Sequence, residues 1–163
     1  MKSKQAQDIT AWTGLEGHWS GRGETYPNPW GPAGPTVGSW HFHFDRVRLN
    51  LIHDYIEERQ NGGCFEAHGV LTVDPASQDV LWFWFDAYGH PPLTPARGRF
   101  RGPSLALEKV TPRGVGRTTF QWSTDELLCG MDCKLTGTEA FIPIMTGRYV
   151  RVPQAASPSV TSL

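Results

Sequence analysis

Residues 64 to 86 place two runs of β-forming residues on either side of a short turn. The first run, CFEAHGVLTV, and the second, VLWFWFD, are rich in β-branched and aromatic side chains. The residues between them, DPAS at 74–77, have the composition of a turn. The stretch therefore predicts a β-hairpin. Because the second run does not alternate as a solvated strand would, we expect it to be covered on both faces or to face a pocket on one side.

The rest of the chain repeats this pattern of short strands. Its 18 glycines and 13 prolines interrupt the sequence at close intervals, and no segment between them has a helical period. Strands are predicted over residues 15–24, 36–45, 47–59, 64–73, 80–86, 96–101, 104–109, 117–123, 127–135 and 140–152. Eight to ten strands in 163 residues, mostly joined by hairpins, predict an all-β protein built as a single antiparallel up-and-down barrel.

The barrel is expected to occupy residues 13–152. Residues 1–12 are polar and are predicted to be an N-terminal tail, with at most a short helix running into Trp12. Residues 153–163 are rich in serine and proline and are predicted to be a disordered C-terminal tail. A proline-rich loop at residues 26–35 carries Trp30, which either caps another part of the molecule or is exposed.

Charge and cysteine content restrict the partners and the compartment. Fifteen basic and 16 acidic residues nearly balance, which argues against a nucleic acid or an anionic membrane as partner. No segment approaches the roughly 18 apolar residues needed to span a bilayer, and the first ten residues lack the apolar core of a signal peptide. The three cysteines form no CxxC pair. We therefore expect a cytoplasmic protein, for which a homodimer is an allowed assembly.

The aromatic content predicts the class of ligand. Seven tryptophans, eight phenylalanines and four tyrosines provide large apolar surfaces of the kind that line ligand pockets. A small apolar or aromatic molecule bound in the barrel lumen, without a cofactor, is the predicted partner. Ligand contacts are predicted for His41, His43, His53, Asp54, Trp82 and Trp84.

The candidate catalytic residues are Tyr55, His68 and Asp86. If they converge with Trp84 inside the barrel, His68 can act as general acid or base, with its tautomer set by Asp86 or Asp54. Tyr55 would then donate a hydrogen bond to a substrate carbonyl. The alternative is structural: His68 is buried against a backbone carbonyl and Asp86 caps the following turn.

The hairpin turn that follows Tyr55 decides which residue lies opposite His68. The turn Asn61-Gly62-Gly63 predicts a hairpin whose register puts either Tyr55 or Ile56 opposite His68. The residues just before it, 57–59 (EER), are expected to be a solvated strand end.

His41 and His43 share one strand face about 6.6 to 6.8 Å apart. At that spacing two imidazoles can chelate one metal ion if His53, His68 or Glu66 supplies a third ligand. The alternative is that they lie on a solvated strand face.

The first and last strands carry the residues expected to close the barrel. An arginine of the last strand, Arg148 or Arg151, is predicted to lie over the indole of Trp19, and we assign Arg148 to this place. Such a pair resembles the calycin superfamily, which includes lipocalins, fatty-acid-binding proteins and nitrobindins.

The chain more closely resembles the bacterial family called domain of unknown function fifteen-seventy-nine, over residues 13 to 151. The motifs that carry this resemblance are LEGHW at 15–19, YPxPW at 26–30, DYxxER at 54–59, HGV at 68–70, DP at 74–75, WFD at 84–86, PARG at 95–98 and GRYxR at 147–151. It implies a calycin-like barrel and no settled activity. Nitrobindin-like barrels hold haem through a histidine late in the chain, whereas this sequence has none after His90.

Four functions follow as hypotheses. The first is binding of a hydrophobic or aromatic molecule in the lumen. The second is an enzyme of isomerase, cyclase or hydratase type that uses the same lumen. The third is a metal or haem site built from histidines. The fourth is a barrel whose lumen is filled by its own side chains, which a cavity well under roughly 300 Å³ would favour.

Overall fold

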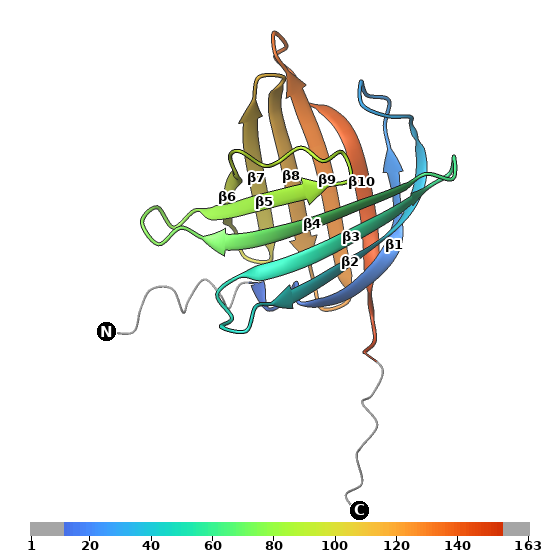
Figure 1. Cartoon of the computed structure of the whole chain (residues 1–163). Helices are drawn as coiled ribbons and strands as arrows, with labels where there is room; N and C mark the ends of the chain where they lie inside the picture. The colour runs from blue at the N-terminus through green and yellow to red at the C-terminus, as the bar shows by residue number, and fades with distance from the viewer. Residues whose placement is uncertain (1–11, 155–163) are drawn as a thin grey trace, which may run out of the picture.

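The computed structural model describes residues 12–154, which form one closed antiparallel barrel (Figure 1). Its strands are β1 (Gly17–Thr25), β2 (Gly34–Phe44), β3 (Leu51–Arg59), β4 (Cys64–Val73), β5 (Val80–Asp86), β6 (Ala96–Phe100), β7 (Ser104–Thr111), β8 (Gly114–Trp122), β9 (Glu126–Leu135) and β10 (Ile142–Val152). Each strand pairs with its neighbours in sequence, and β1 closes the barrel on β10. The predicted all-β up-and-down barrel is confirmed. The tails were expected at residues 1–12 and 153–163, of which residues 1–11 and 155–163 lie outside the described residues.

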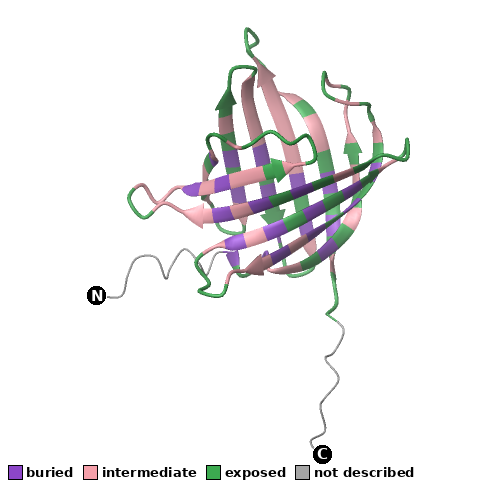
Figure 2. Ribbon diagram, in the orientation of Figure 1, coloured by how far each residue is buried: buried purple, intermediate pink, exposed green. Residues whose placement is uncertain are grey.

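Alternation along the strands separates a buried inner face from an outer face. In β3, Leu51, His53, Tyr55 and Glu57 are buried, while the residues between them are more exposed. The same banding crosses the neighbouring strands in Figure 2. Because side chains of a strand point alternately to its two faces, the position of each residue in this pattern decides whether it can reach the lumen.

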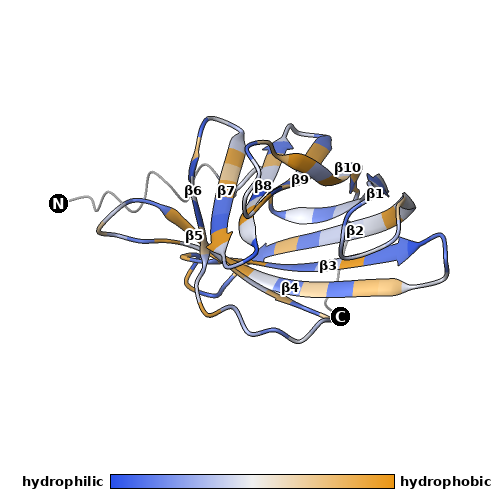
Figure 3. Cartoon of the chain, turned by 90° about the horizontal axis from the view of Figure 1, so that it is seen from above, coloured by the Kyte–Doolittle hydropathy of each residue, from blue (hydrophilic) through white to orange (hydrophobic). Residues whose placement is uncertain are grey.

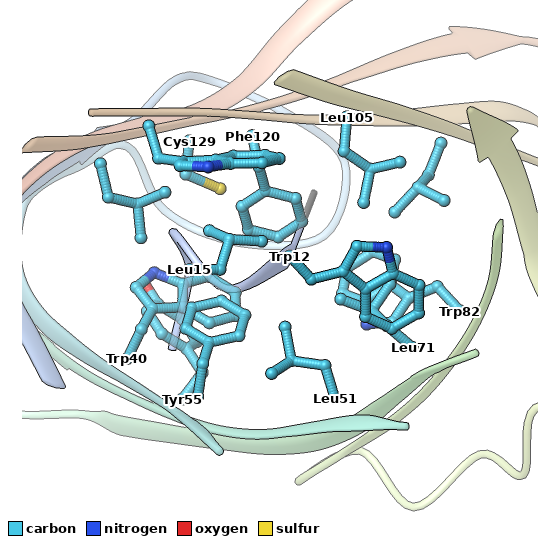
Figure 4. Close-up of a cluster of buried hydrophobic side chains, with 14 of the residues drawn as sticks. Trp12, Leu15, Trp40, Leu51, Tyr55, Leu71, Trp82, Leu105, Phe120 and Cys129 are labelled. Carbon is cyan, nitrogen blue, oxygen red and sulfur yellow. The ribbon is translucent and has the colours of Figure 1, made fainter. Parts of the chain in front are cut away.

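One end of the lumen is packed solid. Trp12 and Leu15 lie between the two walls of the barrel, as Figure 4 shows, and both are fully buried. The side chains around them, all nearly or fully buried, are Trp19, Phe42, Leu51, Leu71, Leu105, Leu107, Phe120, Trp122 and Leu127. Trp12 therefore packs with the barrel, and its ring centroid lies 5.2 Å from that of Phe100.

Arg151 closes this packed end of the barrel. Its guanidinium lies 4.0 Å from the ring centroid of Trp19 and donates hydrogen bonds to the backbone carbonyls of Glu16, Gly14 and Thr124. Arg148, the residue predicted here, is exposed on the outer face and pairs with Glu126. The assignment of Arg148 was wrong because Tyr149 points inward, which directs Arg148 outward.

Replacing Arg151 by leucine should lower the free energy of unfolding by about 2 kcal/mol, because three carbonyls lose a charged donor and Trp19 loses its cation. Urea denaturation of the purified variant measures this loss. Arg148→Leu is the matched control and should change the free energy of unfolding by less than about 0.5 kcal/mol. If both variants lost the same free energy of unfolding, the assignment of the closing contact to Arg151 and not to Arg148 would be contradicted.

Two strands show local departures from regular pairing or packing. The register between β9 and β10 shifts between Pro143 and Met145, so the pairing is irregular next to this proline, which has no backbone N–H to donate. On β5, Trp82 and Trp84 face inward while the outward Phe85 is 46% exposed, so of the two expectations for this strand the pocket is the correct one. Within residues 12–154 there is no helix long and apolar enough to cross a membrane.

Candidate functional site

The other end of the lumen contains a cavity of about 200 Å³. It lies between the wall of β2 to β5 and the wall of β8 to β10. Figure 3 shows from above that β2 to β4 and β8 to β10 lie on different sides of the barrel. Its lining is mostly apolar. The residues that line it are Thr25, Asn28, Trp30, Gly31, Pro32, Trp40, Tyr55, Glu57, Arg59, Phe65, Trp82, Trp84, Asp86, Tyr88, Thr118, Cys129, Met131, Ile144 and Met145.

A buried carboxylate stands in the wall of this cavity. Glu57 is only 1% exposed. Its Oε2 accepts a hydrogen bond from the Tyr55 hydroxyl at 2.7 Å, and its Oε1 accepts one from Arg59 Nε at 2.8 Å. The Tyr149 hydroxyl lies 3.4 Å from that of Tyr55 and extends the chain of polar groups into the barrel. The Glu57–Arg59 ion pair and the Tyr55 phenol thus supply polar groups to a mostly apolar cavity wall, and Tyr149 lies next to Tyr55 without lining the cavity.

Burial keeps the acidic side chains around Glu57 protonated. Burial raises the pKa of Tyr149 to about 12, and the nearby Cys129 adds to this shift. Burial also raises the pKa of the Cys129 thiol to about 12, and Glu57 adds to that shift. Burial, Tyr149 and Glu57 together raise the pKa of Tyr55 well above its usual range. The two phenols are therefore hydrogen-bond donors at neutral pH, and the Cys129 thiol is not a nucleophile there.

Asp86 is the second carboxylate of the cavity. Its Oδ2 accepts a hydrogen bond from Trp84 Nε1 at 3.0 Å, and its Oδ1 accepts one from the backbone amide of Tyr88. It therefore does cap the following turn, as one of the two expectations had it, but it also lines the cavity. Among the described residues no cation lies within ion-pair distance of it.

The loop between β1 and β2 borders the cavity and is held by its own side chains. Asn28 donates to the carbonyl of Tyr26 and accepts from the amide of Trp30, and the Thr25 hydroxyl lies 3.0 Å from the carbonyl of Pro32. Trp30 lines the cavity and is still 39% exposed. Both expectations for Trp30 thus hold, because it borders a cavity that opens to solvent.

His53 is buried between the cavity and the packed end. Its Nε2 accepts a hydrogen bond from Trp82 Nε1 at 2.7 Å, while Nδ1 has no hydrogen-bond partner among the described residues. A Cβ on Gly69 would overlap the His53 ring, so the glycine of β4 makes room for this histidine. Trp82 and Trp84 line the cavity as predicted, but His53 lies behind them.

His68 does not join Tyr55, Trp84 and Asp86 in the lumen. It lies on the outer face, half exposed, with its Nδ1 2.6 Å from Oδ1 of the equally exposed Asp54. The register explains this placement, because Asp54 lies opposite His68 and Tyr55 lies opposite Ala67. Neither predicted register, with Tyr55 or Ile56 opposite His68, was correct.

His41 and His43 also lie on the outer face. His18, His41, Asp54 and His68 are successive partners across β1 to β4 and form a polar row there. The rings of His18 and His41 stack at 3.8 Å, and burial, with His18 and His43 adding to it, lowers the pKa of His41. His41, His43 and Asp54 thus have no access to the cavity.

Glu57 and Arg59 line the cavity but were not predicted as site residues. They were expected at a solvated strand end because the hairpin turn follows directly. The period of two that runs from Leu51 through His53 and Tyr55 continues to Glu57, and this signal places Glu57 on the inner face.

Comparisons with known proteins identify the fold. No protein-family model and no curated protein matches the sequence. The crystal structure of Rv2717c from M. tuberculosis is similar, with a TM-score of 0.66 and 15% sequence identity over 90% of this chain and 98% of that chain. The S-type phycobiliprotein lyase CPES from Guillardia theta is similar with a TM-score of 0.64 and 7% identity, over 92% and 93% of the two chains. Because both sequence identities are low, these comparisons show the fold alone: the chain shares its barrel fold with both structures.

Proposed function

We propose that the protein binds a small, largely apolar molecule in the cavity at the unfilled end of its barrel. The observation that carries this proposal is the contrast between the two ends. One end is packed with buried apolar side chains, while the other keeps about 200 Å³ free between aromatic walls. Natural interiors rarely leave such a space unless it is used, because each empty volume forfeits packing contacts.

The size of the cavity restricts the ligand. Its volume is below the roughly 300 Å³ at which drug-sized sites begin, which is the direction that a filled lumen would favour, but it exceeds the roughly 150 Å³ of an engineered cavity that binds benzene. A molecule with one or two rings, or a compact branched one, fits this space, and a haem does not. In residues 12–154 no three His, Cys, Asp or Glu side chains are placed to hold a metal ion. No histidine is among the residues that line the cavity, so the metal and haem hypotheses gain no support from this site.

The resemblance to calycins supports the same proposal. We infer that the barrel is calycin-like, and its fold is shared with a phycobiliprotein lyase. The residues proposed to contact the ligand are those of the cavity wall, with Trp40, Tyr55, Trp82 and Trp84 at its centre.

A titration with a panel of small aromatic and branched aliphatic compounds should quench the intrinsic tryptophan fluorescence, since Trp30, Trp40, Trp82 and Trp84 line the cavity. Met145→Trp fills the cavity from β10 and should weaken the binding of every hit at least tenfold.

Val150→Trp is the matched control. It adds the same fluorophore to the same strand but on the outer face, where Val150 is 59% exposed, so it should leave affinities within twofold. A flat response of the wild type across the panel would count against a ligand-binding lumen, and so would equal affinities in the two variants.

Acid–base catalysis in the same cavity is the second candidate, and the hydrogen-bonded pair of Tyr55 and Glu57 favours it. NMR of a bound hit in D₂O, with and without enzyme, would detect proton exchange or isomerisation. Full activity of Glu57→Gln and Tyr55→Phe would exclude this pair, whereas His68→Ala, at a histidine of the outer face, is the control and should retain full activity.

A further inference from the structure

We propose that the ligand of the cavity is a compact organic cation, of the quaternary or tertiary ammonium class. This inference rests on the proposed function, because it names the chemical class that the same cavity takes. Three properties of the wall carry it: its charge, its unused hydrogen-bond acceptors and its aromatic rings.

The charged groups that line the cavity do not balance. They are Glu57, Arg59 and Asp86. Glu57 and Arg59 form an ion pair at 2.8 Å, whereas Asp86 is in contact with no cation among the described residues. The cavity wall therefore carries one net negative charge, next to apolar surfaces that weaken its screening by water. A cation is the ligand that neutralises this charge.

The carboxylates also have hydrogen-bonding capacity to spare. An ionised carboxylate accepts about four hydrogen bonds, and each of the two cavity carboxylates receives only two in the described structure. These donors hold the side chains of Glu57 and Asp86 in place and leave further lone pairs for a ligand. A ligand with N–H donors or a positive charge uses them, and an anionic ligand is repelled by them.

The aromatic rings surround the space at several angles. Trp84 lies at the centre of this group: its ring is 4.9 Å from Trp82, 6.2 Å from Trp40 and 6.4 Å from Phe65, with interplanar angles of 65°, 51° and 22°. Trp40 and Trp82 are inclined to Trp84, whereas Phe65 is nearly parallel to it, so these four rings bound the cavity as an aromatic box with faces in more than one orientation. Boxes of aromatic faces attract alkylammonium groups, because the negative π faces interact favourably with a diffuse positive charge. The Trp84–Asp86 hydrogen bond joins this aromatic box to the unpaired carboxylate.

Choline and 3,3-dimethylbutan-1-ol test the proposal, because they have nearly the same shape and differ in charge. Isothermal titration calorimetry of the full chain should show choline binding at least tenfold more tightly than the neutral alcohol. Asp86→Asn retains an acceptor for Trp84 and should reduce the affinity for choline about tenfold while leaving that for the alcohol within twofold.

Glu58→Gln is the matched control. It removes one negative charge from the exposed outer face beside Glu57, where water screens it, so choline affinity should stay within twofold. An equal loss of choline affinity in Glu58→Gln and Asp86→Asn would overturn the proposal, since general charge attraction would then explain the preference.

Two further outcomes separate this inference from the proposed function. If the alcohol or members of the neutral panel bind as tightly as choline, the proposal of a cationic ligand is wrong, while the proposal that the cavity binds a small molecule is retained. If choline, the alcohol and the whole panel fail to bind, both proposals are overturned.

Discussion

Acidification from pH 7 to pH 4.5 should lower the free energy of unfolding by about 3 kcal/mol through His53 alone. Burial holds the pKa of His53 down to about 3 in the folded protein, with His68 adding to the shift and Asp54 opposing it. In the unfolded chain this histidine takes up a proton near its ordinary pKa of 6.5. Between these two values the unfolded state holds one proton more than the folded state. Stability therefore falls as the pH falls, by about 1.4 kcal/mol per pH unit below 6.5.

The surroundings of His53 explain why the folded protein excludes this proton. The side chain has no exposed surface and lies among the rings of Trp40, Phe42 and Trp84, at 5.2 to 5.6 Å between centroids. Its Nε2 already accepts the hydrogen of Trp82 Nε1, so protonation there would break this bond and leave a charge in an apolar site.

Urea denaturation of the wild type and of His53→Gln at pH 7 and pH 4.5 measures this effect. Glutamine can accept the Trp82 hydrogen bond but does not titrate, so the variant should lose about 3 kcal/mol less than the wild type on acidification. His90→Gln, at an exposed loop histidine, should follow the wild type. An NMR titration of the wild-type imidazoles provides an independent check, and protonation of His53 above pH 5 would contradict the prediction.

The fold was predictable because it depends on patterns that tolerate local error. The glycine and proline residues between the strands allowed every strand to be located to within a few residues. Hairpins that join sequential strands then lead to an up-and-down barrel. The beginning of β3 shows the limit: a strand was expected from Val47, but residues 45–50 form a turn in which the Asp45 carboxylate accepts from the amides of Leu49 and Asn50. Turn geometry of this kind depends on single side chains.

The site was less predictable because it depends on strand parity. Tyr55, Trp82, Trp84 and Asp86 lie at the lumen, whereas His68, which was expected beside them, lies on the outer face. A shift of one residue in the register moves every side chain of a strand to the opposite face. Glu57 shows the converse error, since a charged residue before a turn is usually solvated and only the register of β3 brings it inside.

Arg59→Met should lower the free energy of unfolding by about 3 kcal/mol, because it leaves the buried Glu57 carboxylate without its cation. Removing one partner of a buried ion pair costs roughly 3 to 5 kcal/mol, and the Arg59 side chain, at 24% exposure, places this pair at the lower end of that range. Chemical denaturation at neutral pH measures the loss. Arg22→Met, at an exposed arginine of β1, is the matched control and should stay within about 0.5 kcal/mol of the wild type.

Adding Glu57→Gln to Arg59→Met should restore most of the lost stability, since glutamine still accepts from Tyr55 and carries no charge to be paired. A double variant as unstable as Arg59→Met would show that the arginine acts through packing on Phe65, over which it lies at 5.3 Å, and not through the ion pair.

The same variants connect stability with the proposed ligand. Arg59→Met leaves both cavity carboxylates unpaired, so a saturating organic cation should stabilise this variant more than the wild type, whereas a neutral ligand of the same shape should stabilise the two proteins equally.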